Sequence, residues 1–561
     1  MSSSLFRKKS LDKIIKDAEA GLGDSHGHTE LKRVLGVRDL TLMGIAAVIG
    51  AGIFSTIGTA AYHGGPGVIF LFMITAITCG FTALCYAEFA SRIPVSGSAY
   101  TYSYVAFGEI VAWIIGWALI LEYAIGNVVV AISWSAYFNN ILQAFGLNLP
   151  DWLTIGYQTA KMNYETALQS GRQVGDLIYT HAPSIAGIKF IINLPAFIVV
   201  GLITILAYVG INESRKSANF MVGLKIVVLI FIAVIGFWLI FTNGLKGNWT
   251  PFLPEGMNGV LQSVSAVFFA YIGFDAISTT AEECSNPQKD LPKGMIYSLL
   301  ICTLIYIVTA LVITGLVNYK EFNGIADPLA YVFDKINMHK IGFIISISAV
   351  IAATSVLLVF QIGQPRIWMS MSRDGLLPRP FSKISRRFKT PGFATIITGF
   401  VVGIPVLVVD DKLMTDLTSI GTLFAFVLVC GGVVYLPRVE KNPGKFQIPY
   451  INGKYIVSIL FIIFIFLFRK RLGDAFYNIS GESRQEVLFI IFTLLAFLVS
   501  ILSFLRNYSL IPVLGVLFCA YLMIEIPARS WLVFFGWMTV GLTIYFLYGR
   551  RRSKLALSST R

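Results

Sequence analysis

Long apolar runs without charged residues recur along almost the whole chain. Most are long enough for the roughly 20 residues that a helix needs to cross the hydrocarbon core of a bilayer. Continuous runs of this length favour helices over the short alternating strands of a membrane barrel. The pattern predicts an all-α polytopic membrane protein with about fourteen transmembrane helices, at these approximate positions: 40–62, 67–91, 107–143, 190–210, 218–242, 259–281, 295–318, 341–368, 392–410, 415–436, 454–468, 486–504, 508–524 and 531–548.

Glycine interrupts the apolar pattern in the first and the sixth of these helices. The two interruptions are Ile49-Gly50-Ala51-Gly52-Ile53 and Phe269-Ala270-Tyr271-Ile272-Gly273-Phe274. The sixth helix comes five helices after the first, so the breaks fall at matching places in two halves of five helices that have opposite orientations. Broken helices at matching places of an inverted repeat are the best sequence indication of a transporter's binding site. Alternatively, the glycines only allow helices to pack closely.

Unwinding at the two breaks would expose backbone groups that suit a free amino acid. A glycine costs about 1 kcal/mol relative to alanine inside a helix, so unwinding is easy there. Free amides at the start of the outer half-helix suit a carboxylate, and freed carbonyls suit an ammonium group. The aromatic side chains of the second break could close over the substrate. The predicted substrate-binding residues are Ile49, Gly50, Ala51, Gly52, Ile53, Phe269, Ala270, Tyr271, Ile272 and Phe274.

Two ionisable residues within the spans are candidates for proton coupling. Lys225 lies in the fifth span, where a charge is costly enough to suggest a function. Burial disfavours charged lysine, so a site that alternately hydrates and buries Lys225 can bind and release a proton. Alternatively, its ammonium stands where a sodium ion would sit, or it reaches the membrane surface. Glu122 in the third span is the weaker candidate, because a buried carboxylate also serves to tie helices together.

Composition excludes a water-soluble protein and indicates the orientation in the membrane. Of the 561 residues, 56% are hydrophobic and only 13% are charged, against about 25% charged in typical soluble domains. The net charge of +14 would suggest nucleic acid in a soluble protein. Here most Lys and Arg residues fall in segments predicted to be cytoplasmic, so they anchor the protein in the membrane and place both termini in the cytoplasm. No nucleic-acid partner is expected.

No motif for a cofactor, a metal or an enzyme is found. The five histidines are scattered, and the spans contain no metal-spaced cluster, nucleophile motif or phosphate-binding loop. The longest predicted external loop, about 144–189, has no obvious core of its own, which disfavours a receptor ectodomain. We therefore expect neither a catalytic residue nor a cofactor.

Several motifs together resemble the amino acid-polyamine-organocation superfamily, and most closely its cationic amino acid transporter branch. These motifs are Gly50-Ala51-Gly52-Ile53-Phe54, the stretch from Phe269 to Asp275, Glu282-Glu283 with Asn286-Pro287, Gln364-Pro365-Arg366, and Ser372-Arg373-Asp374-Gly375-Leu376-Leu377-Pro378. The chain departs from many relatives at Ala51, where they carry a hydroxyl side chain between the glycines. Backbone recognition survives that difference, but any hydroxyl contact there is lost.

The resemblance implies a LeuT-type fold with a 5+5 inverted repeat and alternating access. It divides the chain into a cytoplasmic segment with a possible surface helix (1–37), a ten-helix core (38–438), four additional helices (439–548) and a basic cytoplasmic tail (549–561). In bacterial relatives a lysine on the fifth span occupies the place of a sodium site and supports proton coupling, and Lys225 matches it.

The leading hypothesis is a proton-coupled amino acid symporter in the cell membrane. Its expected partners are a small-molecule amino acid, protons and the lipid bilayer, and the oligomeric state stays open. The apolar stretch Val356-Leu357-Leu358-Val359 favours a neutral substrate. An amino acid exchanger, a carrier of cationic amino acids and, from another class, a sensor that binds an amino acid without moving it remain alternatives.

Overall fold

The structure is a computed structural model. It describes residues 5–8, 35–92, 98–169, 174–175, 177–185, 188–210, 215–242, 248–385, 387–435, 446–477 and 484–558. The surface helix expected in the N-terminal segment lies outside these residues.

Helices make up most of the described chain, as the apolar runs predict. Eight helical stretches are long and apolar enough to cross a membrane: Gly52–Arg92, Glu109–Ala144, Met221–Thr242, Pro287–Leu316, His339–Arg373, Asp411–Tyr435, Gln485–Arg506 and Ala528–Arg552. Five shorter apolar helices are Leu194–Val209, Val264–Ser278, Gly392–Val406, Lys454–Leu467 and Leu510–Glu525. The first long stretch contains a sharp turn at Gly65, whose φ of 57° suits glycine. These elements make the chain a polytopic helical membrane protein.

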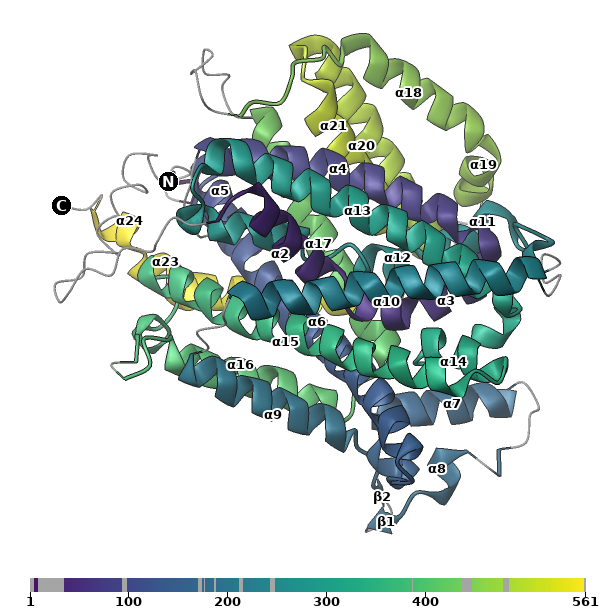
Figure 1. The fold of residues 1–561 in the computed structure, drawn as a ribbon. Coiled ribbons are helices and arrows are strands. Elements are labelled where there is room, and N and C mark those ends of the chain that lie inside the picture. The colour runs from purple at the N-terminus through teal and green to yellow at the C-terminus, as the bar shows by residue number, and fades with distance from the viewer. Residues whose placement is uncertain are drawn as a thin grey trace.

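The elements are labelled in Figure 1. The first half of the chain comprises α2 (Val37–Val48), η2 (Gly52–Thr56), α3 (Ile57–Gly64), α4 (Val68–Arg92), α5 (Ser98–Ala106), α6 (Glu109–Ala144), α7 (Tyr157–Gln169), α8 (Ile178–His181), β1 (Ser184–Ile185), β2 (Ile188–Lys189), α9 (Leu194–Val209), α10 (Arg215–Thr242), α11 (Gly256–Leu261), α12 (Val264–Phe269) and η6 (Phe274–Glu283). The second half comprises α13 (Pro287–Leu316), α14 (Pro328–Lys335), α15 (His339–Arg373), α16 (Gly392–Val406), α17 (Asp411–Tyr435), α18 (Lys454–Leu467), α19 (Arg469–Tyr477), α20 (Arg484–Arg506), α21 (Leu510–Glu525), α22 (Ala528–Ile544), η9 (Tyr545–Gly549), α23 (Arg550–Arg552) and α24 (Lys554–Ser558).

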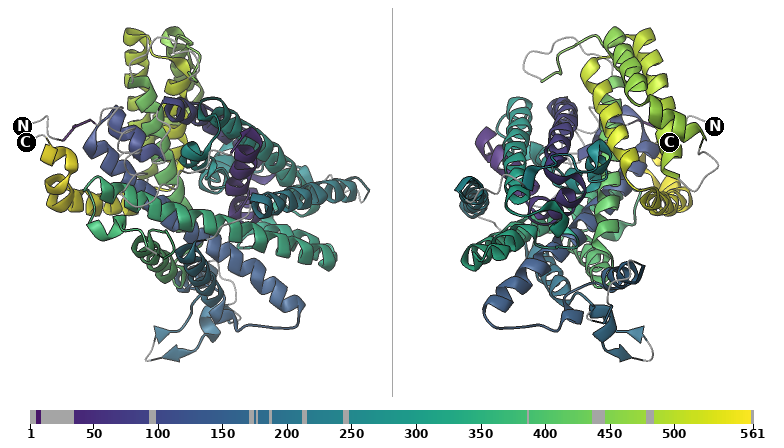
Figure 2. Two further views of the ribbon diagram at one scale, coloured as in Figure 1. Left: turned by 60° about the vertical axis from the view of Figure 1, so that its left-hand side comes forward. Right: turned by 90° about the vertical axis from the view of Figure 1, so that its right-hand side faces the viewer.

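Helix α6 lies at the centre of the bundle and is buried along most of its length. It packs against α15 and α17, while α13 packs against α2 and α4. The pair α9 and α16 lies at one edge, and α18, α20 and α21 lie together at the opposite edge (Figures 1 and 2). The core helices therefore surround the segments between α2 and α3 and between α12 and η6, where the helical pattern breaks.

The long connection between α6 and α9 folds as a small unit. It contains α7, α8 and a hairpin of two-residue strands, β1 and β2. Ala160, Ala182 and Ile191 form a small buried cluster in it, so this loop has a modest core that the sequence did not reveal. The hairpin is the only β-sheet among the described residues, and it lies outside the helical bundle (Figure 1).

Helix α22 is attached to α6 by a pair of stacked tryptophans. The rings of Trp117 and Trp537 lie 4.6 Å apart between centroids. Each indole N–H donates to the other residue's carbonyl oxygen, over 2.9 Å and 3.1 Å. A Cβ on Gly541 would come within 2.3 Å of the Trp117 ring, so the glycine permits this close approach. The last long helix is thus held on the central helix by both stacking and hydrogen bonds.

We expect Trp537→Ala to loosen α22 from α6 and to destabilise the protein. The stacked pair contributes about 0.5–1.5 kcal/mol and an interhelical hydrogen bond about 0.6 kcal/mol, so the loss is roughly 1–2 kcal/mol. Thermal unfolding of the purified protein in detergent measures it. The matched control is Trp238→Ala on α10, because that side chain is 61% exposed on the bundle surface. Equal losses in both variants would contradict the proposed role of the stack.

Candidate functional site

The first break lies where the sequence places two glycines on either side of Ala51. Helix α2 ends at Val48, and Ile49 has an extended backbone with φ −75° and ψ 93°. The chain turns helical again at Ala51 and forms a single π-helical turn, η2, before α3 begins. The helix is therefore interrupted at the position that the glycines predict.

The second break separates α12 from η6. After Phe269 the chain forms turns, and Gly273 adopts φ 112°, a left-handed conformation that L side chains rarely adopt. A 3-10 helix follows from Phe274. A glycine is thus required at this position by its backbone conformation, independently of any packing.

The two breaks touch each other through their backbones. A Cβ built on Gly52 would lie 2.3 Å from the Cα of Ala270, which is backbone that cannot rotate away. Likewise, a Cβ on Gly273 would lie 3.0 Å from the carbonyl oxygen of Ala47. Glycine at positions 52 and 273 therefore allows α2, η2 and the second break to meet at closer range than side chains permit.

Hydroxyl groups hold the backbone on both sides of this contact. The Tyr306 hydroxyl lies 2.9 Å from the carbonyl oxygens of both Val48 and Ala270, and shares its single proton between them. The Thr56 hydroxyl lies 2.9 Å from Gly52 O and 2.8 Å from Ala266 O. Each hydroxyl thus joins the first broken helix to the second.

Lys225 joins the end of α2 to α15. The side chain is fully buried, and its Nζ donates to Ala46 O at 3.2 Å, to Ile49 O at 3.1 Å and to the Ser355 hydroxyl at 2.6 Å. The last carbonyls of a helix have no partner within the helix and carry a partial negative charge, so an ammonium group is suited to them. Lys225 therefore lies buried at the first break and not on the surface of the bundle.

A small cavity lies between the breaks. Its volume is ≈ 10 Å³, about the space that one water molecule needs. Its lining consists of Ala47, Val48, Gly50, Ala51, Gly52, Val130, Phe269, Ile272, Val356 and Phe360. Five of the predicted substrate-binding residues are among these: Gly50, Ala51, Gly52, Phe269 and Ile272.

The other five predicted residues are buried around the cavity without lining it. The carbonyl oxygens of Ile49 and Ala270 accept hydrogen bonds from Lys225 and Tyr306, respectively. Ile53 is completely buried. The Tyr271 hydroxyl donates to Phe72 O on α4, and Phe274 packs against Tyr86 and Phe426.

Glu122 lies apart from the cavity. It is buried in α6, its Cβ faces Gly421 of α17, and its Oε2 has no hydrogen-bond partner among the described residues. The geometry therefore brings Lys225, but not Glu122, to the breaks.

Sequence reasoning missed four members of the cavity wall: Ala47, Val48, Val130 and Phe360. Ala47 and Val48 directly precede the predicted residues at the end of α2. Phe360 lies one helical turn after Val356 on α15, so a search for residues on the same helical face as Val356 would have found it. Val130 lies in the long apolar run of α6, where nothing in the local sequence distinguishes it from its neighbours.

A bundle of membrane-length helices, with two broken helices meeting beside a buried lysine, defines the class as a polytopic membrane protein with a central site. The chain belongs to the amino acid permease family, whose model matches residues 35–499. A second model, for the C-terminus of such permeases, matches residues 508–553. The resemblance to the amino acid-polyamine-organocation superfamily is thereby confirmed.

Curated relatives cover nearly the whole chain. The branched-chain amino acid permease BcaP of Bacillus subtilis (strain 168) is 38% identical over 557 residues, covering 99% of this chain and 100% of the relative. The methylthioribose transporter of the same organism is 34% identical, covering 99% of each chain. The vacuolar cationic amino acid transporter 2 of Arabidopsis thaliana is 32% identical, covering 99% of this chain and 93% of the relative. The family and these relatives are permeases and transporters, not enzymes.

We expect Gly52→Ala to separate the two breaks and to reduce transport. Its Cβ would clash with the backbone of Ala270, and overpacking of this kind typically costs about 1–3 kcal/mol. The measurement is thermal unfolding together with amino acid uptake in liposomes. Gly201→Ala is the matched control, because a Cβ on this exposed glycine of α9 would meet nothing within 4 Å. If both variants behave like the wild type, the close contact at Gly52 is not needed.

Proposed function

We propose that this permease carries amino acids by alternating access, with proton symport, and holds its substrate between the two broken helices. The observation that carries this proposal is the meeting of the breaks at Gly52 and Ala270, beside a cavity and a buried lysine. Membership of the amino acid permease family supplies the substrate class. The two breaks supply backbone groups for the part that all amino acids share.

The carboxylate of the substrate would bind the amides at the start of the outer half-helix. The first amides of a helix lack partners within it and attract anions, and Gly50, Ala51 and Gly52 line the cavity there. Ile49 O accepts from the Lys225 ammonium, which would repel a second cation there, so we assign the ammonium group to the second break, near Phe269, Ala270 and Ile272. Ala270 O accepts from Tyr306 but has a second lone pair available.

The side-chain end of the cavity favours a neutral substrate. Its walls are the apolar side chains of Val130, Ile272, Val356 and Phe360, and no charged residue is part of the lining. The name of the branched-chain amino acid permease agrees with this preference. The vacuolar relative is named for cationic amino acids, so a cationic substrate remains the second candidate.

The small cavity volume supports alternating access. A space of ≈ 10 Å³ holds about one water molecule, so an amino acid enters only when the walls move apart. Phe269 and Phe360 are the large side chains in the lining, and we assign the gating role to them. Tyr271 and Phe274 keep a supporting role in the second break.

We assign to Lys225 the binding and release of the proton that is coupled to transport. A protonated lysine has three N–H donors, and Ala46 O, Ile49 O and the Ser355 hydroxyl lie within hydrogen-bond distance of them. Release of the proton removes one donor and weakens the link between α2 and α15, which frees the inner half of the first helix. In the alternative role, Lys225 is a permanent cation in the place of a sodium ion. Glu122 is a weaker candidate for coupling.

The proposed topology has fourteen membrane crossings. Division of the stretch Gly52–Arg92 at its turn, with α2 joined to the first part, gives two crossings. The remaining long and short apolar helices supply the others. We propose that residues 38–438 form the 5+5 inverted repeat, that 439–548 form four additional helices, and that 1–37 and 549–561 lie in the cytoplasm. The cell membrane is the proposed location.

Counterflow with the purified protein in liposomes tests the function. We expect labelled leucine or alanine to accumulate, and an inward proton gradient to raise the level further. Labelled lysine and arginine test the cationic alternative under the same conditions. Exchange that no gradient stimulates would favour an exchanger, and binding without movement of any of the four would favour a sensor.

Two substitutions at Lys225 separate its possible roles. Lys225→Met removes all three donors, so we expect the loss of gradient-driven accumulation. Lys225→Arg keeps a cation and its donors but cannot release a proton, so we expect exchange to persist while accumulation is lost. The measurement is uptake with and without a pH gradient. If Lys225→Arg accumulates substrate like the wild type, Lys225 is a fixed cation and does not carry the proton.

A further inference from the structure

A second and larger cavity lies next to the outer half of the first broken helix. Its volume is ≈ 70 Å³, enough for several water molecules or a small polar solute. Residues from η2, α3, α6, the α11–α12 junction, the loop at 325–326 and the start of α17 contribute to it. Lys412 and Thr59 are exposed, so the cavity opens to solvent. We call it the vestibule.

The vestibule lies one helical turn from the cavity at the breaks. Gly52 and Phe269 line the inner cavity, whereas Thr56 and Ala266 line the vestibule. On both broken helices the spacing is three or four residues, and one turn rises about 5.4 Å. The hydrogen bond from Thr56 to Ala266 O crosses the seam between the two helices. A solute in the vestibule is therefore about one helical turn from the proposed substrate site.

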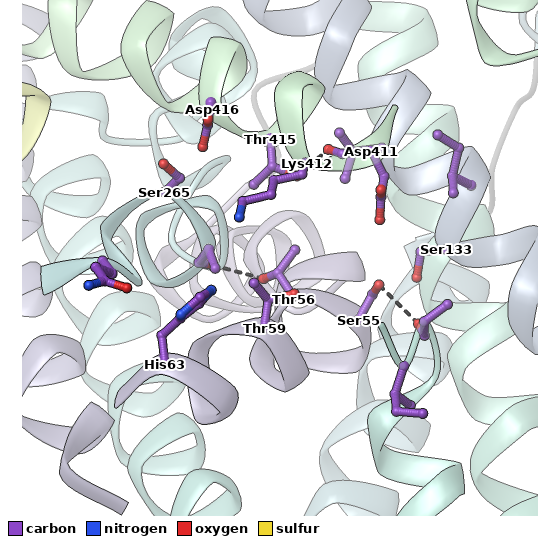
Figure 3. A pocket seen from close by; sticks show the side chains of 16 residues that line it. Ser55, Thr56, Thr59, His63, Ser133, Ser265, Asp411, Lys412, Thr415 and Asp416 are labelled. Carbon is purple, nitrogen blue, oxygen red and sulfur yellow. Dashed lines mark hydrogen bonds between the residues drawn. The ribbon is translucent and has the colours of Figure 1, made fainter. Parts of the chain in front are cut away.

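Charges of both signs face the vestibule from different sides. Figure 3 shows Lys412 pointing between Ser265 and His63, while Asp411 lies nearer Ser133 and Ser55. Lys412 forms no ion pair with any described residue. Asp416 also lines the cavity, beside Ser265, but its carboxylate already accepts a hydrogen bond from the Ser530 hydroxyl. The Lys412 ammonium group, which has no ion pair among the described residues, and the Asp411 carboxylate therefore suit a ligand that carries both charges.

A buried hydroxyl in the wall lacks a partner. Ser133 on α6 is only 3% exposed, and its Oγ has no hydrogen-bond partner among the described residues. A buried polar group without a partner is uncommon and costs free energy. Since Ser133 lines the vestibule beside Asp411, a ligand or water in the cavity is the available partner.

We propose that the vestibule is a second binding site, which holds the zwitterionic amino acid before it enters the site between the breaks. The Lys412 ammonium binds the carboxylate of the substrate, and Asp411 together with the Ser133 hydroxyl binds its ammonium group. This inference rests on the proposed function. It adds that the protein binds two substrate molecules at saturation, in contact with different residues.

Binding stoichiometry tests the proposal. Equilibrium dialysis of the purified, full-length protein is carried out with labelled L-alanine, L-leucine and L-lysine. We expect two molecules bound per wild-type chain. Lys412→Met should reduce this to one, or weaken the outer affinity roughly tenfold or more, as expected for loss of a charge-assisted hydrogen bond. Ser133→Ala should weaken the same component without the loss of a charge.

Two further variants make the outcome specific. Gly50→Val places side-chain atoms against Val356 and should remove the inner component alone. Lys340→Met is the matched control, because this exposed lysine of α15 is not part of the vestibule lining. Thermal unfolding verifies that each variant is folded.

The failures of the two proposals are distinguishable. One molecule bound, lost in Gly50→Val and unaffected by Lys412→Met, would overturn the vestibule site while leaving the proposed transport function intact; the vestibule is then a hydrated path only. Two molecules bound with wild-type affinities in both Lys412→Met and Ser133→Ala would overturn the assigned contacts. No binding of any of the three amino acids would overturn the transport function, and the vestibule site with it.

Discussion

A helix that breaks inside a membrane must find partners for the backbone groups that the break releases. Lipid offers none, so each unsatisfied group costs several kcal/mol. Lys225 supplies donors to two carbonyls at the end of α2, and Tyr306 supplies one that Val48 and Ala270 share. The rest of the site depends on this compensation, because it supplies partners for backbone groups that the break leaves without helical ones.

The same compensation explains why the breaks stay together. Gly52 and Gly273 let the two backbones touch, and the hydroxyls of Tyr306 and Thr56 join the carbonyls on either side. Contact between backbones leaves little space for side chains, so the cavity is small. A change in the donors at the end of α2 therefore acts directly on the space where the substrate is proposed to bind.

The sequence predicts the helices and both breaks because these depend on local properties. Apolar runs need only their length, and Gly50, Gly52 and Gly273 signal unwinding through their own conformational freedom. The partners of Lys225 could not be predicted, because Ser355 lies 130 residues away and only the packed bundle brings the two together. For the same reason the vestibule was missed: Ser133, His63 and Lys412 lie on separate helices, and each looks ordinary in its own segment.

The position of Lys225 also constrains the direction in which substrate and proton influence each other. Coupling between two sites is reciprocal, so a symporter requires that a proton on Lys225 strengthens the binding of the substrate. If the substrate ammonium shared Ile49 O with Lys225, the two positive charges would repel each other and the proton would weaken substrate binding. That coupling would favour exchange of the proton for the substrate. A carboxylate at Ala51 and Gly52, with the ammonium group at the second break, places the negative end nearer the first break, where Lys225 lies. The orientation of the zwitterion between the two breaks, rather than the presence of the lysine alone, therefore decides whether the proton and the amino acid move together.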